Sequence, residues 1–296
     1  MLAKNLLLSL AVAAPVVLAD QLPLRLVSFN IRLATSVPGV NEKPWAERAP
    51  YVVDQLNKTA LDPPCGAPTL IGMQEVFHVQ LTDIKEGLGA GWGHIGVGRD
   101  DGKEKGEYSP IVYRTDVLRV LYNETKWLST TPDVPSFGWG ATNRRIVTLG
   151  VFEHIETGKK FIASNTHLDH QVSKARTESV KVIMERIIAA QEEYGPLGVS
   201  LTGDFNSEPD GDAHSTVMSF GYLEDLHDLT SDRKGPETTY TGFVPGTKET
   251  RIDYVFVGPK EDKKWKVNGY EVLDNVVDDI YISDHRAVVG DVTLVD

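Results

Sequence analysis

The sequence contains many short stretches rich in β-branched and aromatic residues, and these restrict the possible folds more than any other feature. Runs of this kind, bounded by turn-forming residues, are typical of β-strands. Two segments have the apolar periodicity of helices instead, residues 45–58 and residues 173–194, and the second ends at Gly195-Pro196. The strand-like stretches cover residues 24–33, 69–76, 111–114, 146–154, 161–166, 199–204, 252–257 and 287–294.

Strands thus outnumber helices and do not alternate with them. This order favours two packed, mostly antiparallel sheets with helices on the outside, an α+β sandwich. No internal repeat and no linker rich in Pro, Gly or Ser divides the sequence, so we expect one domain over residues 20–296. Asn30, Glu75, His167 and Asp204 fall at the ends of strand-like stretches, where a rigid scaffold can direct side chains into one cleft.

Residues 1–19 have the features of an export signal. Lys4 gives a positive start, an apolar stretch follows, and small residues precede Asp20. We therefore expect a signal peptide and a secreted mature protein. The apolar stretch is too short to span a bilayer, and no later stretch matches that length without charges. Asn57 and Asn123 begin sequons, whose glycosylation would depend on secretion through an endoplasmic reticulum.

The composition bears on stability and on partners. Cys65 is the only cysteine, so core burial must stabilise the fold without an intramolecular disulfide. There are 42 acidic and 30 basic residues, the net charge is -12, and the basic residues are scattered. Long nucleic acid is usually held by clustered Lys and Arg. The charge therefore disfavours a high-affinity nuclease and leaves open one that acts on small fragments with help from a metal.

Asp204 and Asn206 end an apolar stretch and stand two residues apart. Alternate residues of an extended chain share a face, so both side chains can address one ligand. Asp204 could orient a water or a leaving oxygen, and Asn206 could donate its amide to a phosphoryl oxygen. The alternative is a polar turn, because Gly, Asp and Asn all favour turns.

Asp284 and His285 precede the last strand-like stretch. Adjacent side chains diverge in an extended chain, so we assign Asp284 to a metal and His285 to proton transfer. Asp253 stands in a strongly β-prone stretch, where a buried carboxylate needs a partner. We expect that partner to be His285. The alternatives are an ion pair between Asp253 and Arg251, and a surface turn at Asp284.

Carboxylates at strand ends also suggest a metal site. Mg²⁺ or Mn²⁺ takes one or two protein carboxylates and leaves its other positions to water and substrate oxygens, which Glu75 with Asp284 would satisfy. His167, Asp169 and His170 are possible zinc ligands. The absence of thiolates and of an H-E-x-x-H pattern favours the hard cation, and incidental histidines in a polar loop remain an alternative.

Taken together and in this order, the polar segments resemble the endonuclease/exonuclease/phosphatase superfamily of metal-dependent phosphoesterases. Any one segment is weak as a motif, but six in sequence are hard to obtain by chance. The matching segments are Ser28-Phe29-Asn30, Gln74-Glu75, Thr166-His167-Leu168, Gly203-Asp204-Phe205-Asn206, Ile252-Asp253-Tyr254 and Ser283-Asp284-His285.

The resemblance implies a four-layer α/β/β/α sandwich and a divalent cation, usually Mg²⁺. It implies that Glu75, Asp284 and Asn30 hold the cation and that Asn30 also lies beside the substrate. His285 paired with Asp253 would activate water, Asp204 and Asn206 would orient nucleophile and phosphate, and His167 would bind the phosphate or assist the leaving group. Either Asp204 or His285 could be the general base.

Two further segments are similar to the branch related to deadenylases and secreted bacterial members, Gly106 to Pro110 and Asn143 to Ile146. They place Glu107 beside the substrate and offer Arg145, or Arg144, as a phosphate clamp. Arg48 also matches that branch, although an ion pair closing a helix would explain it equally well. Asp169-His170 fits this branch better than the nucleases proper.

We therefore expect a secreted, divalent-metal-dependent phosphoesterase that hydrolyses a phosphate monoester or diester by in-line attack of water. The first alternative is a nuclease acting on DNA or RNA. The second is a secreted binding protein that kept the fold and lost catalysis. A glycosidase with paired carboxylates would leave Asn206, His167 and His285 without roles.

Overall fold

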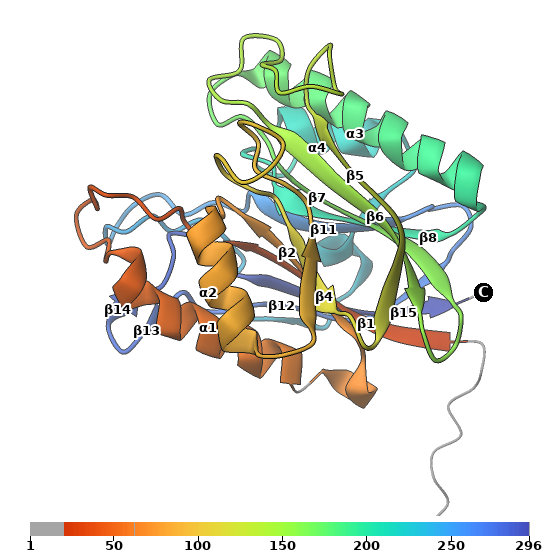
Figure 1. Ribbon diagram of the computed structural model, residues 1–296, viewed down its shortest axis with the longest axis horizontal. Helices are drawn as coiled ribbons and strands as arrows, with labels where there is room; N and C mark the ends of the chain where they lie inside the picture. The colour runs from red at the N-terminus through yellow and green to blue at the C-terminus, as the bar shows by residue number, and fades with distance from the viewer. Residues whose placement is uncertain (1–20, 62, 296) are drawn as a thin grey trace, which may run out of the picture.

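The computed structural model describes residues 21–61 and 63–295, so the predicted signal peptide lies outside the described residues. Within these residues, two large sheets, a two-stranded sheet and four α-helices form the structure (Figure 1). In chain order the elements are β1 (Gln21–Asn30), α1 (Trp45–Leu61), η1 (Pro64–Gly66), β2 (Thr69–Gln74), α2 (His78–Leu88), β3 (Trp92–Ile95), β4 (Ile111–Arg114), β5 (Leu118–Trp127), β6 (Ile146–His154), β7 (Lys160–His167), α3 (Ser173–Tyr194), β8 (Gly198–Asp204), α4 (Asp212–Ser219), β9 (Glu224–Asp225), η2 (Leu226–Leu229), β10 (Arg233–Lys234), β11 (Asp253–Gly258), β12 (Trp265–Val272), β13 (Val276–Val277), β14 (Ile280–Tyr281) and β15 (Val288–Val295).

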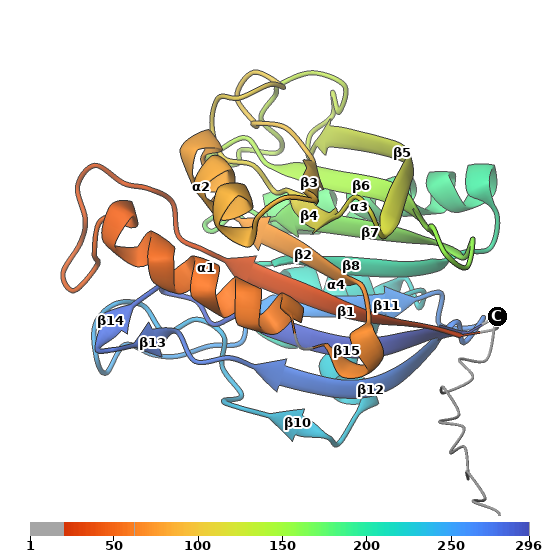
Figure 2. The same cartoon turned by 60° about the horizontal axis from the view of Figure 1, so that its bottom comes forward.

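The two large sheets pack against each other, as Figure 2 shows. The seven-stranded sheet has the order β10-β12-β15-β1-β2-β4-β3, and the six-stranded sheet has the order β5-β6-β7-β8-β11-β9. Pairing is parallel between β1 and β2, between β7 and β8 and between β10 and β12. The other strand pairs are antiparallel. The predicted α+β sandwich of mostly antiparallel sheets is confirmed.

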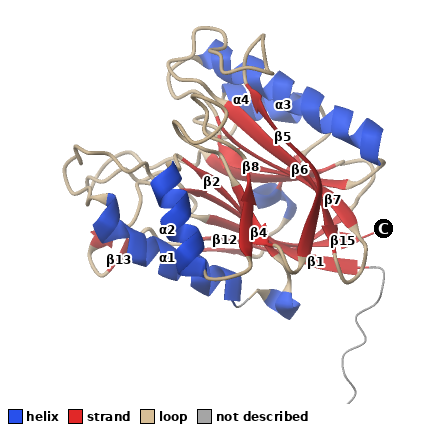
Figure 3. Ribbon diagram, in the orientation of Figure 1, coloured by secondary structure: helices blue, strands red, loops and turns tan. Residues whose placement is uncertain are grey.

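Helices cover the outer face of each sheet, which gives the four layers (Figure 3). α1 and α2 pack on the seven-stranded sheet, where Val52 and Ile84 join the core of Phe29 and Ile71. α3 and α4 pack on the six-stranded sheet. A third apolar cluster fills the space between the sheets, with side chains from both of them. Each sheet therefore buries both faces, which explains the continuous apolar runs of its central strands.

The predicted helices are present. α3 has the predicted bounds, and α1 begins at the predicted Trp45 and ends at Leu61, three residues beyond the predicted end. All eight predicted strands are present, with bounds that differ by at most three residues. None of the helices in the described ranges is long and apolar enough to cross a membrane.

Strand register brings the predicted polar residues to one end of the sandwich. In the six-stranded sheet Asp204 lies in register with His167 on one side and with Asp253 on the other. In the seven-stranded sheet Asn30 lies in register with Gln74, and Glu75 follows directly. Because in-register neighbours point to the same face of a sheet, residues that are far apart in sequence converge here.

A buried polar bridge joins the sheets beneath this end. The side chain of Gln74 donates a hydrogen bond to Oδ1 of Asn165 at 2.8 Å, and Nδ2 of Asn165 donates to the Met73 carbonyl at 2.7 Å. Thr202 donates to Oδ1 of the same asparagine at 3.1 Å. All three side chains are buried, so the bridge fixes how the two sheets are placed at the site.

Candidate active site

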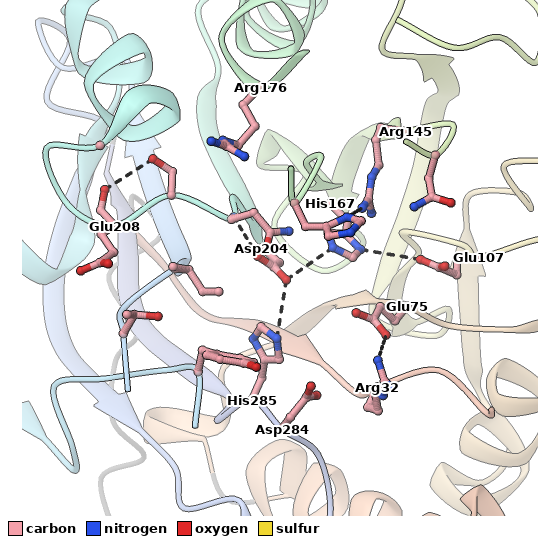
Figure 4. A pocket seen from close by; sticks show the side chains of 18 of the residues that line it. Arg32, Glu75, Glu107, Arg145, His167, Arg176, Asp204, Glu208, Asp284 and His285 are labelled. Carbon is pink, nitrogen blue, oxygen red and sulfur yellow. Dashed lines mark hydrogen bonds and ion pairs between the residues drawn. The ribbon is translucent and has the colours of Figure 1, made fainter. Parts of the chain in front are cut away.

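A cleft of about 750 Å³ lies at this end of the sandwich. Figure 4 shows its side chains pointing toward one another from both sheets and from the loops that follow their strands. Asn30 and Asp253 are fully buried and are hydrogen-bonded to Asp204 and His285, which line the cleft. The other predicted site residues that line the cleft are Glu75, Glu107, Arg145, His167, Asn206 and Asp284.

Asp204 lies between two imidazole rings. Its Oδ2 atom is 3.5 Å from Nε2 of His167 and 3.7 Å from Nε2 of His285. Nδ2 of Asn30 donates to the same oxygen at 3.0 Å, and the backbone N–H of Asn206 donates to Oδ1 at 2.9 Å. Burial raises the pKa of Asp204 to about 7, and the charge of Asp253 adds to the rise. This carboxyl group can therefore exchange a proton near neutral pH.

His285 is held by the acid that the sequence assigned to it. Its Nδ1 atom lies 2.8 Å from Oδ2 of Asp253, so the predicted pairing is present. Burial alone would lower the pKa of His285, but the charges of Asp253 and Asp204 outweigh it and raise the pKa to about 10. Arg251 donates instead to Asp225 at 2.7 Å, so the alternative pair between Arg251 and Asp253 is wrong.

His167 is held differently. Its Nδ1 atom lies 3.7 Å from Oε2 of Glu107, whose two oxygens also accept hydrogen bonds from Arg99 at 2.8 and 2.6 Å. Burial lowers the pKa of His167 well below its usual value, and the charge of Arg145 lowers it further. Burial raises the pKa of Glu107, and the positive charge of Arg99 reduces this rise. Asp204 thus faces one imidazole that favours the charged form and one that favours the neutral form.

Glu75 and Asp284 line the same cleft, where Figure 4 shows Glu75 beside Arg32 and Asp284 beside His285. The oxygens of Glu75 accept hydrogen bonds from Nδ2 of Asn30 at 3.2 Å and from the backbone N–H of Leu33 at 3.1 Å. Burial would raise the pKa of Glu75, but Arg32 and His285 lower it below the usual value. Glu75 adopts a φ of +60°, a strained conformation of the kind that persists at functional sites.

Asp284 has a carboxylate oxygen that a bound cation would satisfy. Its Oδ1 atom is buried and has no hydrogen-bond partner. Burial raises the pKa of Asp284, and the charge of Glu75 contributes to the rise although His285 opposes it. Two carboxylates in one cleft, Asp284 buried with an orphaned oxygen and Glu75 partly buried, fit a hard divalent cation such as Mg²⁺ or Mn²⁺. Oδ1 of Asn30, the third predicted ligand, accepts the backbone N–H of Arg32 at 3.0 Å and keeps a second lone pair.

Two other sets of ligand atoms are less suitable for a metal. Asp204, Asp253 and His285 offer atoms within 4.8 Å of one another. The hydrogen bond between Asp253 and His285 takes Oδ2 and Nδ1 out of this set, whereas Oδ1 of Asp253 has no partner. Asp169 is not available for the zinc alternative. Its oxygens accept backbone N–H groups of Gln171 and Val172 and both donors of Thr142, so it holds the start of α3.

Arg145, which the sequence offered as a phosphate clamp, lines the cleft together with Arg32 and Arg176. Its side chain is buried, and its Nε and one terminal nitrogen have no hydrogen-bond partner. The other terminal nitrogen lies 3.2 Å from Nδ1 of His170. Arg144 does not line the cleft, because it binds Asp100 at 3.2 Å and lies over the ring of Phe137. Buried donors beside a cleft favour an anionic ligand with several oxygens.

Asn206 also keeps donor capacity in the cleft. One of its amide hydrogens goes to the Leu168 carbonyl at 3.1 Å, and an amide nitrogen carries two. The residue has a φ of +47°, a second strained position at the site.

The sequence reasoning missed several residues that line the cleft, among them Arg32, Arg176, Glu208, Asp212 and Tyr240. Arg32 has a φ of +58°, binds Glu42 at 2.8 Å and lies 3.7 Å from Glu75. Its position two residues after Asn30 was the available signal, because alternate residues share a face. The ring of Tyr240 packs edge-on against His285 with centroids 5.1 Å apart. Tyr240 stands in a segment with no clear strand or helix pattern, so nothing in the sequence marked it.

Comparisons with known proteins identify the family of the chain. Residues 27–285 match the model of the Endonuclease/Exonuclease/phosphatase family. The structure is similar to an endonuclease/exonuclease/phosphatase family protein from Bacteroides thetaiotaomicron, with 35% identity, a TM-score of 0.82 and coverage of 93% of this chain and 96% of that chain. It is also similar to a mannosyl-6-phosphatase from the same organism, with 35% identity, a TM-score of 0.81 and coverage of 91% and 99%.

Among curated proteins, the uncharacterized protein L388 of Acanthamoeba polyphaga mimivirus is 28% identical over 198 residues, which are 61% of this chain and 71% of that protein. The match to the family model spans nearly all of the described residues and every predicted motif from Asn30 to His285. The chain therefore belongs to the endonuclease/exonuclease/phosphatase family and is a hydrolase that acts on phosphoric ester bonds.

Proposed function

We propose that this protein is a secreted, divalent-metal-dependent phosphomonoesterase whose substrate is a small phosphorylated compound rich in hydroxyl groups, such as a hexose phosphate. The observation that carries the proposal is Arg145, a buried guanidinium with unpaired donors in the cleft that also holds Glu75 and Asp284. A terminal phosphate offers three non-bridging oxygens, whereas a diester offers two. Such a phosphate can engage Arg145 and still face the carboxylate pair.

The similarity to a mannosyl-6-phosphatase along nearly the whole of both chains supports a phosphorylated sugar as the substrate. The net charge of -12 supports a small substrate over long nucleic acid, because an acidic protein does not attract polyanions. Export is supported by the signal-like pattern of residues 1–19.

The site residues divide the chemistry between them. A cation held by Glu75 and Asp284 would supply positive charge to offset that of the phosphoryl oxygens. Asn30 donates to both Glu75 and Asp204 and so orients the two carboxylates relative to each other. Arg145 and Asn206 bind phosphoryl oxygens, and preorganised donors of this kind need no rearrangement as charge develops.

Proton transfer falls to Asp204 and His285. The two groups face each other at 3.7 Å, so they titrate as a pair and not as separate sites. The attacking water loses its proton to this pair, and Asp253 keeps the ring of His285 in position through Nδ1. His167 donates from Nε2 to the phosphoryl or leaving oxygen, while Glu107 lies behind its Nδ1 atom.

The decisive experiment compares substrate classes. The full chain would be assayed with Mg²⁺, with Mn²⁺ and with a chelator on mannose 6-phosphate, glucose 6-phosphate, a synthetic phosphodiester and single-stranded DNA and RNA. The proposal requires release of inorganic phosphate from the monoesters and its loss with chelator. Faster cleavage of the diester or of nucleic acid would replace the proposal with a nuclease. An Asp204→Asn preparation controls for contaminating phosphatases.

A further inference from the structure

Arg48 on α1 is a fully buried arginine that makes every hydrogen bond a guanidinium can make. Its five donated bonds all go to backbone carbonyl oxygens. The acceptors are those of Lys43 at 2.9 Å, Ile31 at 2.8 Å, Ile282 at 2.7 Å, Arg32 at 3.1 Å and Leu33 at 3.3 Å. No donor is left for a carboxylate, so the ion pair that could have closed the helix is not the role of this residue.

Burying the charge of Arg48 costs free energy of folding, which suggests that the residue has a role beyond packing. A buried charge without an ion pair is destabilising unless hydrogen bonds satisfy it. An arginine whose only task was to anchor α1 would not need acceptors from three separate segments. Its indole neighbour Trp45 lies with its ring 5.4 Å from the guanidinium carbon, so the side chain is held firmly in place.

The acceptors of Arg48 lie close to both carboxylates proposed to hold the cation and to Asn30, which orients Glu75. Ile31 directly follows Asn30, and Ile282 stands two residues before Asp284. The backbone of Leu33 contacts both Arg48 and Glu75, because its carbonyl oxygen accepts a hydrogen bond from Arg48 and its N–H donates one to Glu75. The backbone N–H of Arg32 similarly donates to Oδ1 of Asn30.

A second contact closes the same junction. Oγ of Ser283 donates to the carbonyl of Asn30 at 2.6 Å, and it accepts the backbone N–H of His285 at 3.2 Å. The end of β1 and the segment that carries Asp284 are therefore tied directly through Ser283 and indirectly through Arg48.

We propose that Arg48 is a positioning residue that sets the spacing between Glu75 and Asp284 and thereby the affinity of the site for a divalent cation. The inference rests on the proposed function, because it takes these two carboxylates as metal ligands. Lysine cannot replace Arg48 in this role, because an ammonium has three donors and no fork to reach carbonyls of different segments.

The chain offers a matched control in the middle of β1, at Arg25. Arg25 also joins β1 to α1, through the Thr59 carbonyl at 2.9 Å, and it binds Asp291 on β15 at 2.8 Å. Arg25→Lys therefore perturbs the same strand and the same helix far from the site. A general loosening of α1 against the sheet would affect both variants alike.

The test measures Mn²⁺ binding to the metal-stripped full chain by calorimetry, together with the free energy of unfolding in denaturant. We expect Arg48→Lys to raise the Kd for Mn²⁺ by about 10-fold or more, the range found when groups behind metal ligands are altered. We expect Arg25→Lys to leave the Kd within about twofold of the wild-type value, whatever its effect on stability.

The outcomes separate cleanly. Unchanged Mn²⁺ affinity in Arg48→Lys, or an equal loss in Arg25→Lys at equal stability, overturns the inference. Absence of Mn²⁺ binding in the wild-type protein overturns the proposed function instead. If Arg48→Lys fails to fold, Ser283→Ala decides, because it loosens the same junction without burying a charge. A weakened Mn²⁺ site in that variant supports the inference, and wild-type affinity overturns it.

Discussion

Nδ1 of His285 lies 2.8 Å from Oδ2 of Asp253, and both side chains are buried. Burial opposes the charge of the imidazole, but Asp253 and Asp204 outweigh it and raise the pKa of His285 to about 10. The ring of the metal-free protein should therefore stay protonated through neutral pH. We expect Asp253→Asn to lower this pKa by more than one unit, measured by NMR titration of the histidine rings. An unchanged pKa would show that Asp253 does not hold the charge on His285.

The two adjacent arginines give a prediction with its own control. Arg145 is buried in the cleft with unpaired donors, whereas Arg144 binds Asp100 outside it. Loss of hydrogen bonds from a charged donor costs about 1.5 to 3 kcal/mol, so Arg145→Lys should lower kcat/KM for a phosphomonoester by about 10- to 100-fold. Arg144→Lys should change it by less than about twofold. Equal effects in steady-state phosphate release would contradict the assignment of Arg145.

Repulsion between the carboxylates of Glu75 and Asp284 should lower the stability of the metal-free protein. Burial and Glu75 raise the pKa of Asp284, so its ionised form is disfavoured in the fold at neutral pH. Asp284→Asn should raise the Tm of the metal-free protein and abolish its response to Mg²⁺. The wild-type protein should gain about 2.7 kcal/mol at a cation concentration 100 times the Kd. A wild-type Tm that ignores both Mg²⁺ and chelator would refute the carboxylate pair as a cation site.

The lowered pKa of Asp169 should make the free energy of unfolding depend on pH. Burial would raise its pKa, but hydrogen bonds from Val172, Gln171 and Thr142 outweigh it and lower the pKa to about 2. A lowered pKa stabilises the fold above the unfolded value near 4, and the gain is lost as pH falls toward 2. Asp169→Asn should thus cost about 1 to 2 kcal/mol at pH 7, after allowance for solvent screening, and less at pH 3. Denaturant unfolding at both pH values measures the difference, and a cost independent of pH would contradict this account.

Much of the fold could be predicted because central strands are buried on both faces and therefore read as continuous apolar runs. β5 and β12 escaped prediction for the opposite reason. β5 is the edge strand of its sheet and alternates exposed and buried residues, among them Arg119 and Glu124, and β12 does the same near the edge of the other sheet. The short helices α2 and α4 lack the length that makes a helical period stand out.

The site was predictable in its members and less so in its contacts. The order of motifs identified Asp204, His167 and His285, and the partner of His285 followed from the need to satisfy Asp253. The position of Asp204 between two imidazoles depends on the pairing of β8 with β7 and β11, which spacing in the sequence does not encode. For the same reason the carbonyl acceptors of Arg48 could not be foreseen, since one of them, that of Ile282, is 234 residues from Arg48 in the sequence.

The most direct test of the whole account is metal-dependent release of phosphate from mannose 6-phosphate by the wild-type protein and by Asp204→Ala and His285→Ala. Removal of one preorganised group at a site of this kind costs about 100- to 1000-fold in turnover. The account predicts phosphate release by the wild-type protein that chelator abolishes, and a loss of at least this size in both variants, with circular dichroism unchanged. Full metal-dependent turnover in either variant would contradict it.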